Sequence, residues 1–269
     1  MIPRKVYIGF MSPTGGVKKV ALALKAGFEH NQEQVDYSVF SFLSPLERQL
    51  VPAFADGDLL ILCVPVFAGR MPKVLYEWQE LQGHGAMAIA ACIYGNRACD
   101  DATRELCDFL KARSFKVVGA AELVAEHSLE RRLAHGRPDE ADKTQLAAMA
   151  EQILSALYSD NLGELHFEAE GPYKPYSPSA VPELISIEAC RKCHSCARIC
   201  PAAIIDRESR SVPENLRDKC MGCLACVAHC PEKNRDLPPK VKEAVQVRMQ
   251  MVYEKNALPK ANSLKLGLY

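Results

Sequence analysis

Eight of the twelve cysteines in this chain lie in two runs that share one spacing. Each run reads C-x2-C-x2-C-x3-C-P, and each cysteine of the second run follows its counterpart by thirty positions. The ligand candidates are Cys190, Cys193, Cys196, Cys200, Cys220, Cys223, Cys226 and Cys230. Three thiolates at this spacing hold one [4Fe–4S] cluster, and the fourth cysteine ligates the other cluster. The spacing therefore predicts two clusters and a role in electron transfer.

Two tetrahedral zinc ions are the alternative, because C-x2-C pairs also bind zinc. The third cysteine in each run and the prolines after the fourth cysteines, Pro201 and Pro231, favour clusters over zinc. The runs resemble the bacterial two-cluster ferredoxin family, which has a small α+β domain. That resemblance implies one ligand set of Cys190, Cys193, Cys196 and Cys230. It implies a second set of Cys220, Cys223, Cys226 and Cys200.

The composition and the start of the chain exclude other function classes. Lys plus Arg and Asp plus Glu both number 33, so the zero net charge gives no reason to expect nucleic acid or an anionic membrane as partner. The chain shows no signal-peptide pattern and no apolar run long enough to span a membrane. Without an export signal, cysteines at ligand spacing indicate metal binding rather than disulfides. We expect a cytoplasmic protein, not inserted in a membrane, whose partners are redox proteins.

Strand and helix patterns alternate over residues 1–160. The expected strands are 5–11, 35–42, 58–66, 86–94 and 115–124, and the expected helices are 17–28, 72–81, 100–113 and 139–158. Continuous apolar runs such as DLLILCVPV, at 58–66, indicate strands that are covered on both faces. The alternation predicts a doubly wound α/β domain with a five-stranded parallel sheet.

Three loops after these strands could form a binding site, because ligands of such sheets lie beyond the carboxyl ends of the strands. The first loop is Ser12, Pro13, Thr14, Gly15, Gly16 and Val17, whose hydroxyls and helix N–H groups suit a phosphate. The second is Pro65, Val66, Phe67, Ala68 and Gly69, and the third is Tyr94, Gly95, Asn96 and Arg97. Each loop taken alone also fits an ordinary turn or helix cap.

Together the three loops resemble the flavodoxin family, which binds FMN. The resemblance covers residues 1–160 and implies a sheet order of 2-1-3-4-5, with the phosphate in the first loop and the flavin ring between the other two. Cys99 stands where many flavodoxins have an aromatic residue that stacks on the flavin, so Phe67 or Tyr94 would have to stack instead. His127, at the end of the fifth strand, is either close to a flavin edge or a structural histidine.

The rest of the chain divides into three segments. Residues 161–182 are rich in proline and small residues, which is typical of a linker, and Tyr173 and Tyr176 are expected to pin it to a domain surface. Residues 183–238 form the ferredoxin-like domain. Residues 239–269 are expected to contain a helix at 240–255, packed back on one of the domains, and an extended tail. No acid–base pair or activated nucleophile is visible, so no catalytic residue is predicted.

The complete pattern resembles flavodoxin–ferredoxin fusion proteins. It predicts the relay of low-potential electrons between two [4Fe–4S] clusters and an FMN. Two alternatives stay open. One is a flavin-dependent oxidoreductase that reduces a small acceptor, a quinone or a nitro compound, with the clusters as its electron feed. The other is a cluster protein whose first domain no longer binds FMN.

Overall fold

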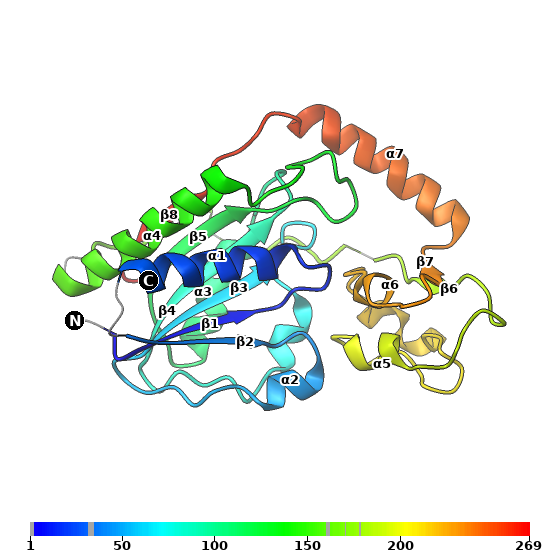
Figure 1. Cartoon of the computed structure of the whole chain (residues 1–269), viewed down its shortest axis with the longest axis horizontal. Helices are drawn as coiled ribbons and strands as arrows, with labels where there is room; N and C mark the ends of the chain where they lie inside the picture. The colour runs from blue at the N-terminus through cyan, green and yellow to red at the C-terminus, as the bar shows by residue number, and fades with distance from the viewer. Residues whose placement is uncertain (1–2, 32–34, 160–161, 170, 178) are drawn as a thin grey trace.

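The computed structural model describes residues 3–31, 35–159, 162–169, 171–177 and 179–269. An α/β domain lies beside a smaller module that carries both cysteine runs, here called the cysteine module (residues 183–238), and a long helix passes above both (Figure 1). No helix in these described ranges has the length and apolar character needed to cross a membrane.

A six-stranded sheet forms the centre of the α/β domain. Its strands are β1 (Lys5–Phe10), β2 (Asp36–Ser41), β3 (Leu59–Pro65), β4 (Met87–Tyr94), β5 (Lys116–Val124) and β8 (Ser263–Leu266), in the order β2-β1-β3-β4-β5-β8. The first five are parallel and lie in the predicted order. The predicted count of five strands is wrong, because the tail forms β8, antiparallel to β5. The added strand pairs backbone groups of β5 that would otherwise lie at an open sheet edge.

Helices cover both faces of the sheet (Figure 1). Helices α1 (Gly16–Asn31) and α4 (Glu140–Ser159) pack on one face, and α3 (Ala102–Ala112) packs on the other. Side chains of β3 alternate between the two cores: Leu59 and Ile61 face α1 and α4, whereas Leu60 and Leu62 face α3. This period of two in a fully buried strand explains the continuous apolar run in the sequence.

Two short helices differ from the sequence expectation. The helix expected at 72–81 is only a 3-10 helix, η1 (Lys73–Glu77). Trp78 follows it, stacked on Phe42 at a centroid distance of 4.8 Å and donating from Nε1 to the carbonyl of Arg48 at 2.9 Å. The helix ends directly before Trp78, whose indole is buried in the core.

Helix α2 (Pro45–Gln49) was not expected, although its start has a clear signal in the sequence. The Ser44 hydroxyl accepts from the Glu47 N–H at 3.3 Å, and the Glu47 carboxylate accepts from the Ser44 N–H at 2.7 Å, which is a capping box. The helix carries the buried Arg48, which donates to the carbonyl of Pro201 at 2.6 Å. It therefore helps to dock the cysteine module on the α/β domain.

The cysteine module repeats its backbone as well as its sequence. It consists of β6 (Glu183–Leu184), α5 (Ser195–Ile199), η2 (Glu214–Lys219), α6 (Ala225–Ala228) and β7 (Arg235–Asp236), with β6 and β7 antiparallel. Residues in the left-handed region recur thirty positions apart: Lys192 and Gly222 (φ 57° and 61°), His194 and Leu224 (58° and 60°), Ala203 and Lys233 (52° and 50°). The two halves thus present their cysteines on matching loops.

Helix α7 (Pro239–Asn256) spans from the cysteine module to the α/β domain (Figure 1). Near its start, Lys242 pairs with Asp236 at 2.6 Å. Toward its end, the guanidinium of Arg132 lies over the ring of Tyr253 at 4.2 Å. The expectation that this helix packs back on a domain is confirmed, and it contacts both parts of the molecule.

Candidate cofactor site

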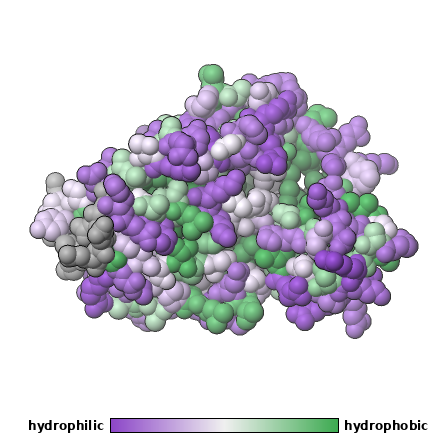
Figure 2. All heavy atoms as spheres, viewed as in Figure 1, coloured by the Kyte–Doolittle hydropathy of each residue, from purple (hydrophilic) through white to green (hydrophobic). Residues whose placement is uncertain are grey.

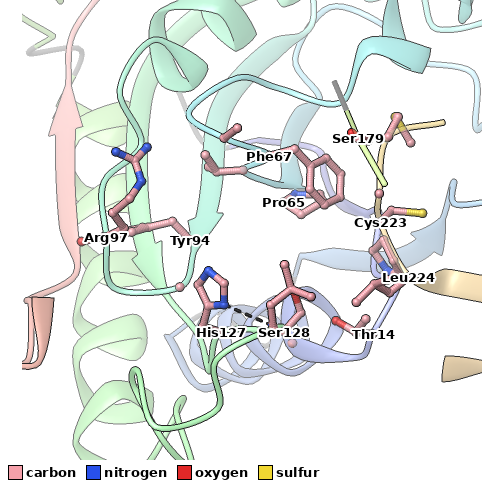
Figure 3. Close-up of a pocket in the computed structure, with 18 of the residues that line it drawn as sticks. Thr14, Pro65, Phe67, Tyr94, Arg97, His127, Ser128, Ser179, Cys223 and Leu224 are labelled. Carbon is pink, nitrogen blue, oxygen red and sulfur yellow. Dashed lines mark hydrogen bonds between the residues drawn. The ribbon is translucent and has the colours of Figure 1, made fainter. Parts of the chain in front are cut away.

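A cavity of about 310 Å³ lies between the α/β domain, the cysteine module, the linker and α7. Of the three predicted loops, the residues that line it are Ser12, Pro13, Thr14, Gly16, Val17, Pro65, Val66, Phe67, Ala68, Gly69, Tyr94, Gly95 and Arg97. Figure 3 shows these loops around an open centre, with Phe67 on one side and Thr14 and Ser128 on another. In the space-filling view, apolar residues gather in the recess below α7 (Figure 2).

Two residues of the predicted set, Gly15 and Asn96, do not line the cavity. Asn96 is only 1% exposed, and its amide donates to the carbonyls of Asn256 at 2.7 Å and Leu258 at 2.9 Å. Its side-chain oxygen accepts from the Lys260 N–H at 2.9 Å. Asn96 thus anchors the end of α7, and no local signal could reveal partners 160 or more positions away.

The first loop forms a cradle of N–H groups at the start of α1. The Ser12 hydroxyl accepts from the Lys18 N–H at 2.9 Å. The N–H groups of Gly16 and Val17 have no acceptor among the described residues, and both residues line the cavity. Free N–H donors beside open space at the N-terminus of a sixteen-residue helix fit a phosphate group.

The aromatic residues of the cavity are Phe67, Tyr94 and Tyr176. Cys99, the residue that replaces the expected stacking aromatic, is buried and does not line the cavity. Phe67 is held in a tight turn, with backbone hydrogen bonds to Arg70 of 2.9 and 3.1 Å. The structure thus supplies flat apolar walls without an aromatic residue at position 99.

His127 lines the cavity with one of its ring nitrogens fixed. Nδ1 accepts from the N–H groups of Leu129 and Glu130, both at 3.1 Å, so the proton of a neutral ring is on Nε2. Burial lowers the pKa of His127 below its usual 6.5, the charge of Arg97 lowers it further, and that of Glu130 opposes the shift. The ring is therefore a neutral N–H donor at the wall of the cavity.

We expect the free energy of unfolding to fall as the pH drops below about 6.5, because the unfolded chain then binds a proton that the folded His127 resists. The contribution of the neutral His127 to the free energy of unfolding is fully present above that pH and is lost as the pH falls toward the lowered pKa of the folded protein. Denaturant midpoints of the wild type and His127→Asn, which keeps an acceptor near Nδ1, measure it. A variant that loses stability with acid as steeply as the wild type would contradict the assignment.

A buried ion pair fixes the linker at the edge of the cavity. The side chains of Arg70 and Glu105, 8% and 0% exposed, form two hydrogen bonds of 2.7 and 2.6 Å. Glu105 also accepts from the hydroxyls of Tyr76 and Tyr176, at 2.8 and 2.9 Å. The Arg70 guanidinium stacks on Tyr176 at 4.0 Å and on Tyr173 at 5.1 Å. The expectation that the two linker tyrosines pin it is confirmed, whereas the role of Glu105 had no signal in the sequence.

Two further cavities lie among the cysteines. Cys200, Cys220, Cys223 and Cys226, here called the near set, line one, and Cys190, Cys193, Cys196 and Cys230, the far set, line the other. These are the two ligand sets that the ferredoxin resemblance implies. Within the described ranges, no three or more Cys, His, Asp or Glu side chains are grouped to hold a single metal ion.

Hydrogen-bond donors point at cysteine sulfurs in both sets. The Gly222 N–H donates to Cys220 Sγ at 3.5 Å, and the Asn234 N–H donates to Cys230 Sγ at 3.3 Å. Such N–H donors stabilise thiolates and tune cluster potentials. The cysteines that surround each space, with donors at their sulfurs, fit a [4Fe–4S] cluster.

The near set forms part of the wall of the large cavity. Cys220, Met221, Cys223 and Leu224 line both the large cavity and the near-set cavity. Figure 3 shows Cys223 and Leu224 on the side of the large cavity opposite Tyr94. The far set does not line the large cavity. Only one of the two ligand sets is thus adjacent to the loops of the α/β domain.

A family model described as a 4Fe-4S dicluster domain matches residues 183–236. No curated protein matches the chain. Similar solved structures include a flavodoxin from the domain Archaea, with 16% identity and a TM-score of 0.40 over 57% of this chain and 99% of that one. Another is oxidised Flavodoxin 2 from Bacillus cereus, with 15% identity and a TM-score of 0.41 over 57% and 99%. A third is the apo form of an NADH:FMN oxidoreductase (EMOB), with 16% identity and a TM-score of 0.43 over 57% and 89%.

At such low identities and scores, the fold assignment of the first part depends on its own sheet. A parallel order of β2-β1-β3-β4-β5 is that of the flavodoxin-like doubly wound fold. The dicluster match covers the cysteine module. The chain thus combines an α/β domain of flavodoxin-like sheet order with a segment, residues 183–236, that matches the model of a 4Fe-4S dicluster domain.

Proposed function

We propose that this protein is an electron carrier that relays low-potential electrons between two [4Fe–4S] clusters and an FMN bound in the large cavity. The observation that supports the proposal is that the large cavity and the near-set cavity have lining residues in common. Residues Cys220 to Leu224, except Gly222, line both the near-set cavity and the cavity formed by the three flavodoxin-like loops. A cluster on the near set would therefore lie directly against the flavin site.

Each cluster exchanges one electron and FMN exchanges one or two, and the protein supplies their ligands, positions and surroundings. The N–H groups of Gly16 and Val17 bind the phosphate of FMN. Phe67 and Tyr94 form the flat apolar walls of the cavity. The Nε2–H of His127 is a hydrogen-bond donor for the flavin at the cavity wall. The near set holds the cluster beside the flavin, and the far set holds the cluster that is more remote from it.

The linker and α7 complete the cavity. Ser177, Ser179 and Ala180 of the linker and Val245, Met249 and Val252 of α7 line it from outside the α/β domain. These segments reduce the contact of a bound flavin with water. A carrier of this design exchanges electrons with partner proteins at the cysteine module.

Anaerobic purification followed by iron, acid-labile sulfide and flavin assays tests the proposal. We expect about eight irons per chain and one FMN. Thr14→Glu should lower the flavin content without loss of iron, because its carboxylate repels the phosphate, whereas the neutral Thr14→Gln should retain flavin. Zinc in place of iron would overturn the proposal. A protein that contains the clusters but binds no flavin, even after FMN is added, would also overturn it.

A further inference from the structure

The internal repeat allows the surroundings of the two cysteine sets to be compared position by position. Glu232, which pairs with Arg191, lines the far-set cavity. Five other residues that line it are Arg191, His194, Ser195, Asn234 and Arg235. Their counterparts at a distance of thirty positions line the near-set cavity and are Met221, Leu224, Ala225, Ile204 and Ile205. At each of these five places, a polar or charged residue at the far set corresponds to an apolar residue at the near set. The backbone of the two halves is repeated, but the polarity of the residues that surround the two cysteine sets is not.

Arg235 is the largest of these differences. It is only 2% exposed, and its Nη1 donates to Cys196 Sγ of the far set at 3.8 Å. Its other bonds go to the carbonyls of Arg210 at 2.7 Å and Pro182 at 2.9 Å. No carboxylate of the described residues forms an ion pair with it. A buried guanidinium requires a nearby anion, and a cluster with four thiolate ligands is an anion.

Further nitrogen atoms at the far set lack acceptors. Nε of Arg235, Nε of Arg210 and Nδ1 of His194 are buried without a hydrogen-bond partner in the described part of the chain. All three residues line the far-set cavity. The lining of the near-set cavity, by contrast, includes no Lys, Arg, His, Asp or Glu.

We propose that the two clusters have different reduction potentials, and that the far cluster has the higher one and takes the first electron. Reduction adds a negative charge to an anionic cluster. A buried cation and N–H donors stabilise that charge, whereas an apolar lining does not. Arg235 also interacts with Cys226 of the near set. His194 and Arg210 line the far cavity alone, so the difference does not depend on Arg235 only. This inference depends on the two clusters of the proposed function and not on its flavin.

A stepwise reductive titration of the full-length protein, followed by low-temperature EPR of the reduced clusters, tests the inference. The wild type should show two separate midpoints. Arg235→Ile, which copies the counterpart Ile205, should lower the higher midpoint, and the lower midpoint should fall as well because Arg235 also interacts with Cys226. Because that change also removes two backbone hydrogen bonds, His194→Leu, which copies Leu224, is the second variant. It should lower the higher midpoint and leave the lower one unchanged.

Arg207→Met is the matched control. Arg207 belongs to the same module, but it is exposed and lines neither of the two cysteine cavities. Solvent screens such a charge, so neither midpoint should move.

Equal midpoints in a wild-type protein that contains eight irons would overturn the inference and leave the proposed function intact. A shift of only the lower midpoint in His194→Leu, or of neither, would also overturn it. An iron content that corresponds to a single cluster would instead overturn the proposed function, and the inference with it.

Discussion

A protein with Cys220→Ala and Cys223→Ala is expected to bind FMN and one cluster, but to reduce its flavin at only a small fraction of the wild-type rate. The two changes remove half of the near set, so the cluster beside the cavity is lost. The far cluster remains but has no contact with the cavity. Flavin absorbance after rapid anaerobic mixing with a reduced one-electron ferredoxin measures the rate; two donor molecules are oxidised per flavin fully reduced, in addition to one for each cluster that stays reduced.

The matched control removes the equivalent cysteines of the first run, Cys190→Ala and Cys193→Ala. This variant loses the far cluster and keeps the near one, so electrons on the near cluster still reach the flavin. Iron assays confirm that each variant retains one cluster. If the two double variants reduce their flavin equally fast, the near cluster is not on the path to FMN, and the relay is wrong.

Replacing Arg70 with methionine is expected to lower the free energy of unfolding by about 3–5 kcal/mol, since it leaves the buried carboxylate of Glu105 without its cation. The ion pair raises the pKa of Arg70, because the hydrogen bonds that its guanidinium donates to Glu105 favour the charged form. Burial, and after it the Glu105 carboxylate, raises the pKa of Tyr76 to about 12. Denaturant unfolding of the purified variant measures the loss.

Tyr176→Phe is the control for this prediction. It removes one hydroxyl donor to Glu105 and leaves the ion pair in place, so the loss should be only about 1 kcal/mol. Adding Glu105→Met to Arg70→Met should recover part of the lost stability, because no unpaired charge is then buried. A single Arg70→Met variant that is as stable as the wild type would show that the pair is solvated and does not fix the linker.

The parts of the fold that the sequence predicted are those with strong local patterns. The apolar runs at 58–66 and 86–94 appear as β3 and β4, and the long amphipathic pattern at 139–158 appears as α4. The cluster ligands could be predicted because each set of cysteine spacings lies within one short stretch of sequence. The loop residues were readable because parallel strands bring their carboxyl ends to one edge of the sheet.

The parts that the sequence did not predict depend on distant partners. Strand β8 is only four residues long and exists because β5 offers it an edge, some 140 positions earlier in the chain. The pairing of Arg70 with Glu105 joins residues 35 positions apart, on a loop and a helix. The location of α7 over the cavity likewise had no local signal, because its stripe of apolar residues does not specify which surface it meets.

The final strand has a consequence for the kinetics of the molecule. The chain leaves the sheet after β5 and returns to it as β8 at Ser263, and the cysteine module lies between the two, so this module is inserted in the α/β domain rather than appended to it. Two covalent connections hold the near cysteines at the large cavity. The effective concentration of one redox site at the other is set by these tethers and is the same in dilute and in concentrated solution. Electron exchange between the two domains should therefore be first order, with a rate constant that does not change with protein concentration.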